Sequence, residues 1–221
     1  MKRGAIVLGC LGAIAVVVVL FLIFGVSTYN KLVALDEGVK TQWSQVESVY
    51  QRRADLIPNL VRTVEGAANF EKSTLEAVVN ARARVGQVTG GGGAPGTAPD
   101  PTANPEAFRQ FEQAQAGLSS ALSRLLVVVE RYPDLKSNAN FLNLQSQLEG
   151  TENRITVERM RYNETAQGFN TTVRRFPANI IAGFTGFKEK TYFQSAPGSE
   201  KAPEVNFEFG GTSTATATAP R

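Results

Sequence analysis

The side chains in this sequence that could perform chemistry are a small set of carboxylates and arginines. Glu149 and Glu152 lie one helical turn apart, with Glu158 further along, so they could form an acid–base or metal-binding pair. The chain has no histidine, which removes the commonest general base at neutral pH and the commonest metal ligand. Arg154 and Arg159 lie in the same stretch. We therefore expect these carboxylates to form ion pairs on a solvated helix face.

A second polar cluster lies between Arg52 and Asn59, where a proline interrupts a helical pattern. A proline inside a helix leaves the carbonyl four residues earlier, here that of Ala54, without its donor. Nearby Arg or Asn side chains could satisfy this carbonyl, because a buried polar group must be paired. The sequence favours a structural role, in which the cluster binds the polar stripe of a later helix. A ligand or partner site at the proline is the alternative. The candidate residues are Arg53, Asp55, Pro58 and Asn59 in the cluster and Asn153, Arg154, Arg159 and Asn163 in the later helix.

The composition excludes several classes of function. The chain has 221 residues, one cysteine and a formal net charge of +3, and its acidic and basic residues are interspersed. So small a charge does not suit a nucleic-acid-binding protein, and interspersed charges are typical of solvated helix surfaces. The Gly-rich stretch 90–105 lacks the Lys-Ser/Thr pair of a phosphate-binding loop. We therefore expect no enzymatic activity, no cofactor, no metal site and no nucleic-acid partner.

An apolar stretch runs from residue 4 to residue 26 without a charge or a proline. As a helix it is roughly 35 Å long, enough to cross a hydrocarbon core of about 30 Å. It is longer than the apolar region of a cleaved signal peptide, which has about 7–15 residues. Cys10 follows a loose lipidation motif, but few apolar residues precede it. We interpret residues 4–26 as a transmembrane helix and keep cleavage and lipidation as less favoured alternatives.

Charge predicts the orientation of this span. Lys2 and Arg3 precede it, so the positive-inside rule places residues 1–3 in the cytoplasm. Residues 27–193 would then lie outside the cytoplasm, in the periplasm or at the cell surface. Because only residues 1–3 would be available inside the cell, we expect the span to hold the protein at the membrane rather than to transmit a signal through it.

Apolar residues recur every three or four positions along most of the remaining chain, which predicts amphipathic helices. We expect helices over residues 29–68, 69–85, 105–132 and 138–176, the first continuous with the span and kinked near Asp55 by Pro58. Asn104 and Pro105 form a helix start, and Pro177 closes the last helix. Short connections between long helices predict an all-α, elongated antiparallel bundle of about four helices. The Gly- and Pro-rich residues 86–104 should form a flexible loop, and residues 194–221 should form a disordered tail.

Two blocks of residues resemble the LemA family of bacterial proteins. The first comprises Tyr29-Asn30, Leu32-Val33, Trp43-Ser44-Gln45-Val46 and the run QRRADLIPNLV from Gln51 to Val61. The second comprises Tyr162-Asn163, Phe169-Asn170, the run RFPAN from Arg175 to Asn179, Gly186-Phe187 and Tyr192-Phe193. The resemblance covers nearly all of residues 4–193 and implies a membrane-anchored antiparallel helical bundle with no established enzymatic activity. It also implies that residues 90–105 are a variable insertion.

The segment 178–193 follows the last long helix and is rich in aromatic and aliphatic residues. If the bundle alternates up and down, this helix ends back near the membrane, so the segment could contact the lipid interface. It could equally fold back over the open end of the bundle core. The candidate residues for these two roles are Arg175, Phe176, Pro177, Phe184, Phe187, Tyr192 and Phe193.

Together these features predict a non-enzymatic, membrane-anchored scaffold or interaction protein of the cell envelope. Its partners would be the lipid bilayer, other copies of the chain in a homo-oligomer, or an envelope protein, since a heptad-like stripe can extend its packing to neighbouring copies. The alternative is a sensory or ligand-binding ectodomain that acts through a partner in the membrane.

Overall fold

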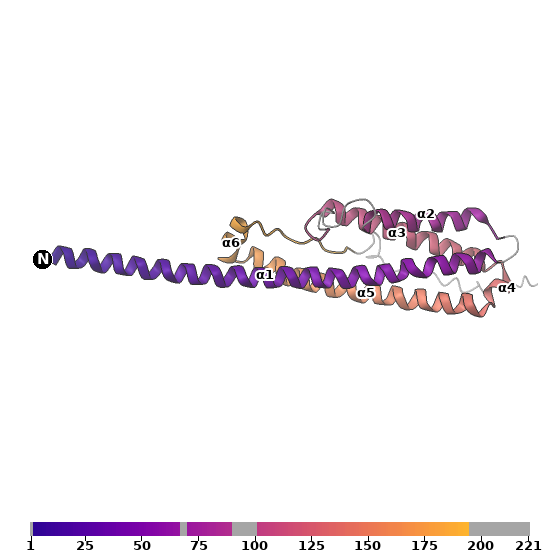
Figure 1. Ribbon diagram of the computed structural model, residues 1–221, viewed down its shortest axis with the longest axis horizontal. Helices are drawn as coiled ribbons and strands as arrows, with labels where there is room; N and C mark the ends of the chain where they lie inside the picture. Colours follow the sequence, from indigo (N-terminus) through magenta and orange to yellow (C-terminus); the bar gives the residue numbers. More distant parts are fainter. Residues whose placement is uncertain (1, 67–69, 90–100, 195–221) are drawn as a thin grey trace, which may run out of the picture.

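The computed structural model describes residues 2–66, 70–89 and 101–194, and every regular element within them is an α-helix. The helices are α1 (Lys2–Glu65), α2 (Lys72–Thr89), α3 (Pro105–Val129), α4 (Pro133–Lys136), α5 (Ala139–Arg174) and α6 (Ala178–Thr185) (Figure 1). The predicted all-α class is therefore confirmed.

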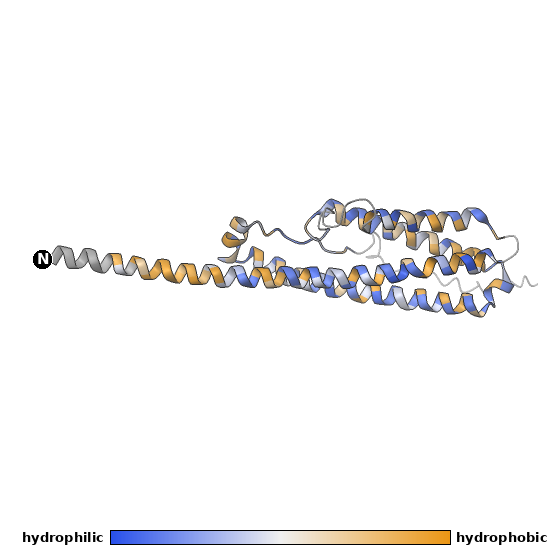
Figure 2. Cartoon of the chain, viewed as in Figure 1, coloured by the Kyte–Doolittle hydropathy of each residue, from blue (hydrophilic) through white to orange (hydrophobic). Residues whose placement is uncertain are grey.

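α1 joins the apolar N-terminal stretch to the bundle in one unbroken helix of 64 residues. Exposed apolar side chains follow one another along α1 from Leu11 to Val26 (Figure 2). This helix is long and apolar enough to cross a membrane, where a helix satisfies its own backbone hydrogen bonds. The prediction that the span and the first bundle helix form one continuous rod is confirmed.

α5 lies antiparallel to α1 along the bundle, and α2 and α3 form a second pair beside them (Figure 1). The interior holds two hydrophobic clusters. One lies at the end from which the apolar part of α1 projects, which we call the span-proximal end. There the ring of Trp43 lies 5.1–5.5 Å from the rings of Phe108, Phe111 and Tyr162. The other cluster fills the distal end, where α1 to α5 all contribute apolar side chains.

The caps of α3 and α5 explain why these helices begin where they do. The side-chain oxygen of Asn104 accepts hydrogen bonds from the first backbone N–H groups of α3, and Asn138 does the same for α5. These bonds satisfy donors that have no partner within the helix. At the other end of the chain, Gly186 ends α6 with a φ of 82°, a left-handed conformation that glycine adopts without strain.

The boundaries of α2 differ from the sequence prediction. α2 begins at Lys72 rather than at residue 69, and it continues through Gly86 to Thr89, so the loop does not begin at residue 86. One glycine costs a helix only about 1 kcal/mol relative to alanine, which is too little to end it. The buried side chain of Val85 also holds this part of α2 against the core.

The predicted flexible loop is also wrong at its other end. Residues 101–104 form a turn in which Thr102 is fully buried. The backbone carbonyl of Thr102 accepts a hydrogen bond of 3.3 Å from the N–H of Thr191, so tertiary contacts order this turn. The other residues of that loop, 90–100, and residues 195–221 of the predicted disordered tail lie outside the described residues.

Pro58 neither ends nor sharply bends α1, which continues to Glu65 (Figure 1). The carbonyl of Ala54 has no helix donor because Pro58 lacks an N–H. It accepts a hydrogen bond of 3.0 Å from Nε of Arg82 on α2. An arginine therefore satisfies this carbonyl, as the sequence suggested, but the arginine comes from the second helix of the bundle rather than from the cluster around Pro58.

Substitution of Arg82 by alanine should destabilise the bundle by about 1–2 kcal/mol, because the Ala54 carbonyl loses its only strong donor. In a Pro58→Ala background the new N–H of residue 58 can bind this carbonyl, so the same substitution should cost less. A double-mutant cycle measured by chemical denaturation of the full-length protein in detergent checks this coupling. The exposed Arg84 provides the matched control on α2. Equal costs in the two backgrounds would contradict the assignment.

Candidate functional site

Arg53 is the most deeply buried charged residue of the predicted polar cluster, with only 2% of its surface exposed. It projects from α1 into the bundle, and its Nη1 donates hydrogen bonds to Glu152 Oε2 at 2.9 Å and to Ser119 Oγ at 3.0 Å. Its Nη2 donates to the side-chain oxygen of Gln115. Its guanidinium also lies 5.1 Å from the ring centre of Tyr50. Arg53 therefore links α1 to α3 and to α5.

A cavity of about 480 Å³ adjoins Arg53. Its lining includes Tyr50, Arg53, Glu112, Gln115, Glu152 and Arg159.

The charges around the cavity are paired across the helices. Arg159 lies 3.7 Å from Glu112, and Arg53 is paired with Glu152. Burial raises the pKa of the Glu112 carboxyl, although Arg159 and the backbone N–H of Gln194 act in the opposite direction. Two arginines facing two carboxylates form a charge-balanced centre that connects three helices.

Arg53 also binds the hydroxyl that lines the cavity. Ser119 Oγ accepts a hydrogen bond from Arg53 Nη1, which binds the carboxylate of Glu152 as well. Two donors of this centre, Arg53 Nε and Gln115 Nε2, have no partner among the described protein atoms. Within the residues that the structure describes, no group of three or more carboxylate or cysteine side chains could hold a metal ion.

The structure separates the other members of the predicted cluster from Arg53. Asp55 is exposed and accepts a hydrogen bond of 2.8 Å from Gln51 of the same helix. Asn59 is also exposed and accepts one of 2.8 Å from Arg62. Pro58 is half-buried between them in the sequence. Only Arg53 of this cluster faces the bundle interior, because it alone lies on the buried stripe of α1.

The carboxylates of α5 form pairs, but not with the arginines that the sequence suggested. Glu152 binds Arg53, whereas Glu158 binds Arg161 at 2.7 Å and accepts a hydrogen bond from Gln42. Glu149 is exposed and accepts a hydrogen bond from the side chain of Gln145. These carboxylates therefore face different neighbours and do not converge on one site.

The segment after α6 forms the second polar site of the bundle. We call residues 187–194 the strap, because they pass along α5 in extended form (Figure 1). The side-chain amide of Asn163 binds both the N–H and the carbonyl of Phe193, each at 2.9 Å. Asn170 binds the N–H and the carbonyl of Lys190 in the same way, at 2.7 and 2.9 Å. The two asparagine side chains thus satisfy backbone N–H and carbonyl groups of the strap, as a neighbouring β-strand would.

The strap completes the span-proximal core. The side chain of Phe193 is buried, and its ring stacks on that of Trp43 at 5.9 Å and lies 4.7 Å from that of Phe108. Phe187 packs on Phe169 and on Tyr29, each at 6.1 Å between ring centres. These contacts agree with the second role considered for the segment 178–193, which was to cover the open end of the core.

The strap also carries a buried lysine. The ammonium of Lys190 lies 2.7 Å from Oδ1 of Asp36 on α1 and 3.2 Å from the hydroxyl of Thr102. Burial by itself would raise the pKa of the Asp36 carboxyl, but hydrogen bonds from Lys190 and Lys40 outweigh this effect and lower it. Asp36 therefore stays ionised and neutralises the lysine within the core.

Asp36 and Asn170 are not among the candidate site residues that the sequence predicts. Lys190, which a lipid-contact role of this segment would direct towards the headgroups together with Lys188, is buried against Asp36 instead. One signal was available: Asn163 and Asn170 lie seven residues apart and each directly follows a ring of the apolar stripe, Tyr162 or Phe169. A polar residue repeated at heptad spacing beside a buried stripe indicates a specific partner for each amide. No comparable pattern marks the Asp36–Lys190 pair, which only the fold brings together.

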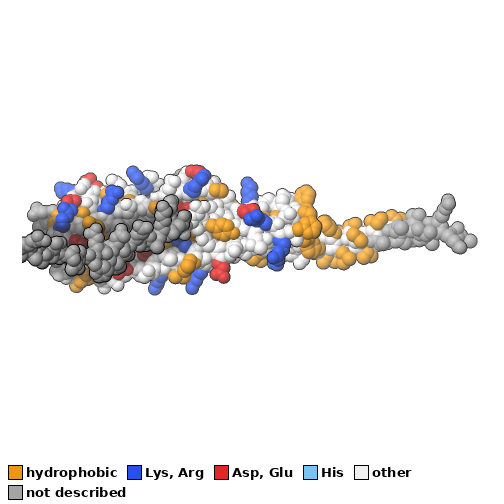
Figure 3. Space-filling model, turned by 180° about the vertical axis from the view of Figure 1, so that it is seen from behind, with side chains coloured by type: hydrophobic (Ala, Val, Ile, Leu, Met, Phe, Trp, Pro, Cys, Tyr) orange, Lys and Arg blue, Asp and Glu red, His pale blue; other side chains and the backbone are white. Residues whose placement is uncertain are grey.

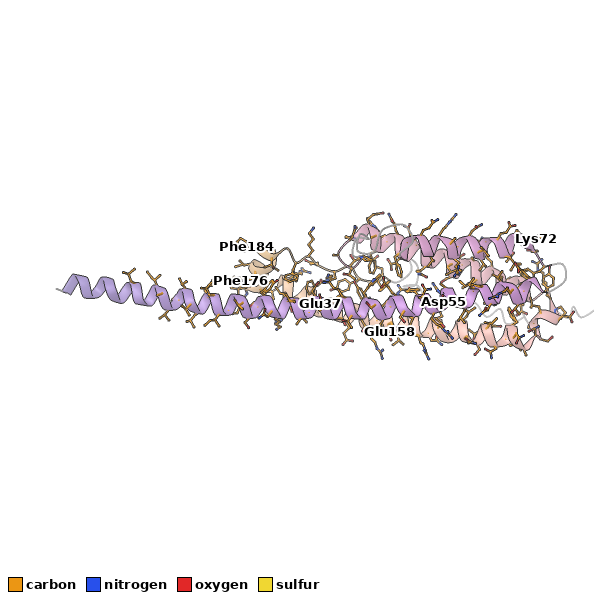
Figure 4. The ribbon with its side chains drawn as sticks, in the orientation of Figure 1. Glu37, Asp55, Lys72, Glu158, Phe176 and Phe184 are labelled. Atoms are coloured by element: carbon orange, nitrogen blue, oxygen red, sulfur yellow. The ribbon has the colours of Figure 1, made fainter. Side chains whose placement is uncertain are left out.

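The remaining predicted residues lie at the span-proximal end. Arg175 is exposed, and Phe176 and Phe184 expose 75% and 87% of their surfaces. Figure 4 shows these two phenylalanines near one another at this end of the bundle. Pro177 follows a cis peptide bond and precedes α6.

Tyr192 lies further along, on the strap, and is partly exposed. The structure therefore divides the segment 178–193 into a strap whose Lys190 and Phe193 side chains are buried and an exposed apolar part.

Replacement of Arg53 by alanine should lower the free energy of unfolding by about 2–4 kcal/mol, because Gln115 loses its partner inside the bundle. Glu152→Gln should cost less, because the glutamine oxygen can still accept a hydrogen bond from Arg53 and water at this half-exposed position screens the lost charge. Chemical denaturation followed by circular dichroism measures both effects. The exposed Arg52 is the matched control, since it donates only a long hydrogen bond of 3.4 Å to Gln147. Similar small costs for the two arginines would show that Arg53 does not organise the centre.

The pair between Asp36 and Lys190 predicts a pH dependence. The folded-state pKa of Asp36 lies below its unfolded value near 3.8, so this carboxylate stabilises the protein above that pH. The contribution is lost as the pH falls from there through the folded-state pKa. The stability difference between the wild type and Asp36→Asn should therefore be full at neutral pH and should shrink in acid. Glu37→Gln, at an exposed neighbouring position, serves as the control. A difference that stays constant down to strongly acidic pH would contradict the assignment.

Comparisons with known proteins identify the family to which this sequence is similar. The sequence matches the model of the LemA family over residues 42–207. It is 30% identical over 206 residues to magnetosome protein MamQ 2 of Paramagnetospirillum magneticum, covering 87% of this chain and 75% of that protein. It is 28% identical over 182 residues to magnetosome protein MamQ of Magnetospirillum gryphiswaldense, covering 78% and 66%. Protein LemA of Metamycoplasma hominis is 22% identical over 167 residues, covering 76% and 69%. The resemblance seen in the two motif blocks is confirmed, and the chain belongs to the LemA family.

Proposed function

We propose that this protein is a non-enzymatic, membrane-anchored scaffold of the cell envelope, which presents its helical bundle to other copies of itself or to an envelope partner. The observation that carries this proposal is the continuity of α1, which runs from the candidate membrane span to the distal end of the bundle without a break. A helix that continues from lipid into the bundle without a break keeps the bundle in line with its own membrane span.

The interior of the bundle supports a structural role. The buried charges of the cavity are paired with one another, and the aromatic rings of the span-proximal core pack on the strap. Lys2 and Arg3 favour a cytoplasmic N-terminus by the positive-inside rule, which would place the bundle outside the cytoplasm. In this arrangement the outer surfaces of the helices are the parts available to partners.

The outer face of α5 offers one such surface. Val157 and Met160 lie one turn apart on this helix and expose 39% and 59% of their surfaces. Beside Met160, a shallow groove of about 550 Å³ reaches Tyr192 of the strap and Glu164. Exposed apolar side chains with polar neighbours are typical of sites of protein contact. We therefore place the expected contact with another copy or an envelope partner on this face.

Photo-crosslinking in native membranes tests the proposal. A benzophenone amino acid at position 160 of the full-length protein should give intermolecular adducts, which mass spectrometry then assigns to the same chain or to another protein. Position 79 on α2, which lies on the other side of the bundle in Figure 1 and is 48% exposed, is the matched control. It should give fewer adducts if contact is confined to the α5 face.

The outcomes distinguish the candidate functions. Adducts between copies support a self-associating scaffold, and adducts with one envelope protein support a partner-binding scaffold. A third probe at position 20 in the span, where Leu20 is 61% exposed, tests the alternative. Adducts with a single integral membrane protein from position 20 and none from position 160 would favour the sensory ectodomain instead. Only intramolecular adducts, from both positions 160 and 79, would contradict a scaffold that uses the bundle surface.

A further inference from the structure

Three apolar side chains at the span-proximal end face away from the bundle. Phe184 and Phe176 expose 87% and 75% of their surfaces, and Ile180 exposes 44%. We call these three residues the span-proximal patch. On the opposite side of α6, Ala178 and Ala182 are buried against the bundle. α6 therefore has an apolar inner face, which packs on the bundle, and an apolar outer face, which has no partner in the described part of the chain.

The position of the patch along α1 is the key observation. Phe187, directly after α6, packs on Tyr29 of α1, and Thr28 and Leu32 of α1 are buried at this level. The apolar stretch of α1 ends at Val26, only three residues before Tyr29. At 1.5 Å per residue these three residues correspond to about 5 Å along the helix axis. Figure 2 accordingly shows α6 beside the point where the apolar part of α1 ends.

This distance places the patch at the depth of lipid headgroups. A bilayer has a hydrocarbon core of about 30 Å and measures about 40–45 Å with its headgroup regions, so each headgroup region is several ångströms thick. When residues 4–26 of α1 span the core, α6 lies at the level of this region. On the face seen in Figure 3, hydrophobic side chains gather most densely where the bundle meets the apolar part of α1.

Basic side chains lie close in the sequence to the patch and to the α1 residues beside it. Lys31 follows the span, Arg175 precedes Phe176, and Lys188 follows α6; all three are exposed. No carboxylate in the described part of the chain forms an ion pair with any of them. Aromatic rings at the interface with lysine or arginine directed towards the headgroups are typical of protein surfaces that lie on a membrane. The charges favour a surface that contains anionic lipid.

We propose that the span-proximal patch inserts into the headgroup region of the bilayer that α1 spans, and so gives the bundle a second contact with the membrane beside the helix itself. The inference rests on the membrane anchoring in the proposed function. α1 already holds α6 at the bilayer surface. The contact between the patch and the lipid therefore forms at a high effective concentration and needs no further association step. Two contacts on different helices restrict the tilt of the bundle, which one helix alone does not.

Site-directed spin labelling of the full-length protein measures this contact. Cys10→Ala removes the only native cysteine, and single cysteines are then placed at positions 184, 24 and 127. The protein is reconstituted at one copy per nanodisc, in phosphatidylcholine with phosphatidylglycerol. Power saturation compares accessibility to oxygen, which concentrates in lipid, with accessibility to a nickel chelate, which stays in water. Position 127 is the matched control, because Val127 is 71% exposed on α3, outside the span-proximal end.

A label at position 184 should be more accessible to oxygen than to nickel, as a label at position 24 in the span should be, whereas a label at 127 should show the reverse. If the label at 24 is exposed to lipid and the label at 184 is exposed to water, the proposed insertion of the patch is wrong, whereas the membrane anchoring by α1 still stands. Water exposure at both positions would overturn the anchoring as well. Protection at 184 that appears only when a disc holds several copies would assign the patch to a second copy of the chain.

A double substitution gives an independent readout. Phe176→Ser with Phe184→Ser removes the two most exposed rings of the described residues, neither of which has a ring contact there, so the unfolding midpoint should change little. A label at position 180 should then shift from oxygen accessibility towards nickel accessibility. A label at 180 that is equally lipid-exposed with and without the two rings would show that they do not make the contact.

Discussion

The antiparallel pairing of α1 with α5 is the interaction on which the rest of the structure depends. α1 runs as one helix from its apolar N-terminal part to the distal end of the bundle, and so sets the axis of the bundle. α5 begins at the distal end and returns along this axis. α6 must therefore lie beside the point where α1 leaves its apolar stretch, and the strap runs back along the bundle from there to Trp43.

Buried polar side chains define how the helices align along this pair. Arg53 reaches partners on both α3 and α5, and the ion pair of Lys190 with Asp36 joins the strap to α1. Buried polar contacts of this kind add little net stability, but they penalise alignments in which a charge is left unpaired. A shift of α5 by one turn would separate Arg53 from Glu152 and Asn170 from the strap. The polar contacts thus specify one alignment among several that apolar packing alone would tolerate.

The two ends of the bundle differ in how the core is closed, because only the span-proximal end carries the strap and α6. At the distal end, the helices close on one another through a continuous apolar cluster. At the span-proximal end, the core is completed by an extended segment held by two asparagines, and aromatic side chains remain exposed outside it. Exposed aromatic rings are costly in water and favourable at a lipid interface, so this asymmetry agrees with a bundle that stands on a membrane.

Local patterns in the sequence determined the four long helices, the cap at Asn104, the continuity of the span with the bundle, and the family, because each depends on residues close together in the chain. Neither α4 nor α6 was predicted from the sequence. The sequence also marked Arg53, but not its partners. Only the tertiary structure decided that Arg82 satisfies the Ala54 carbonyl, that α2 continues through Gly86, and that the segment 178–193 is divided between core and surface. Each of these depends on contacts between residues far apart in the sequence, which periodicity and local propensity do not encode.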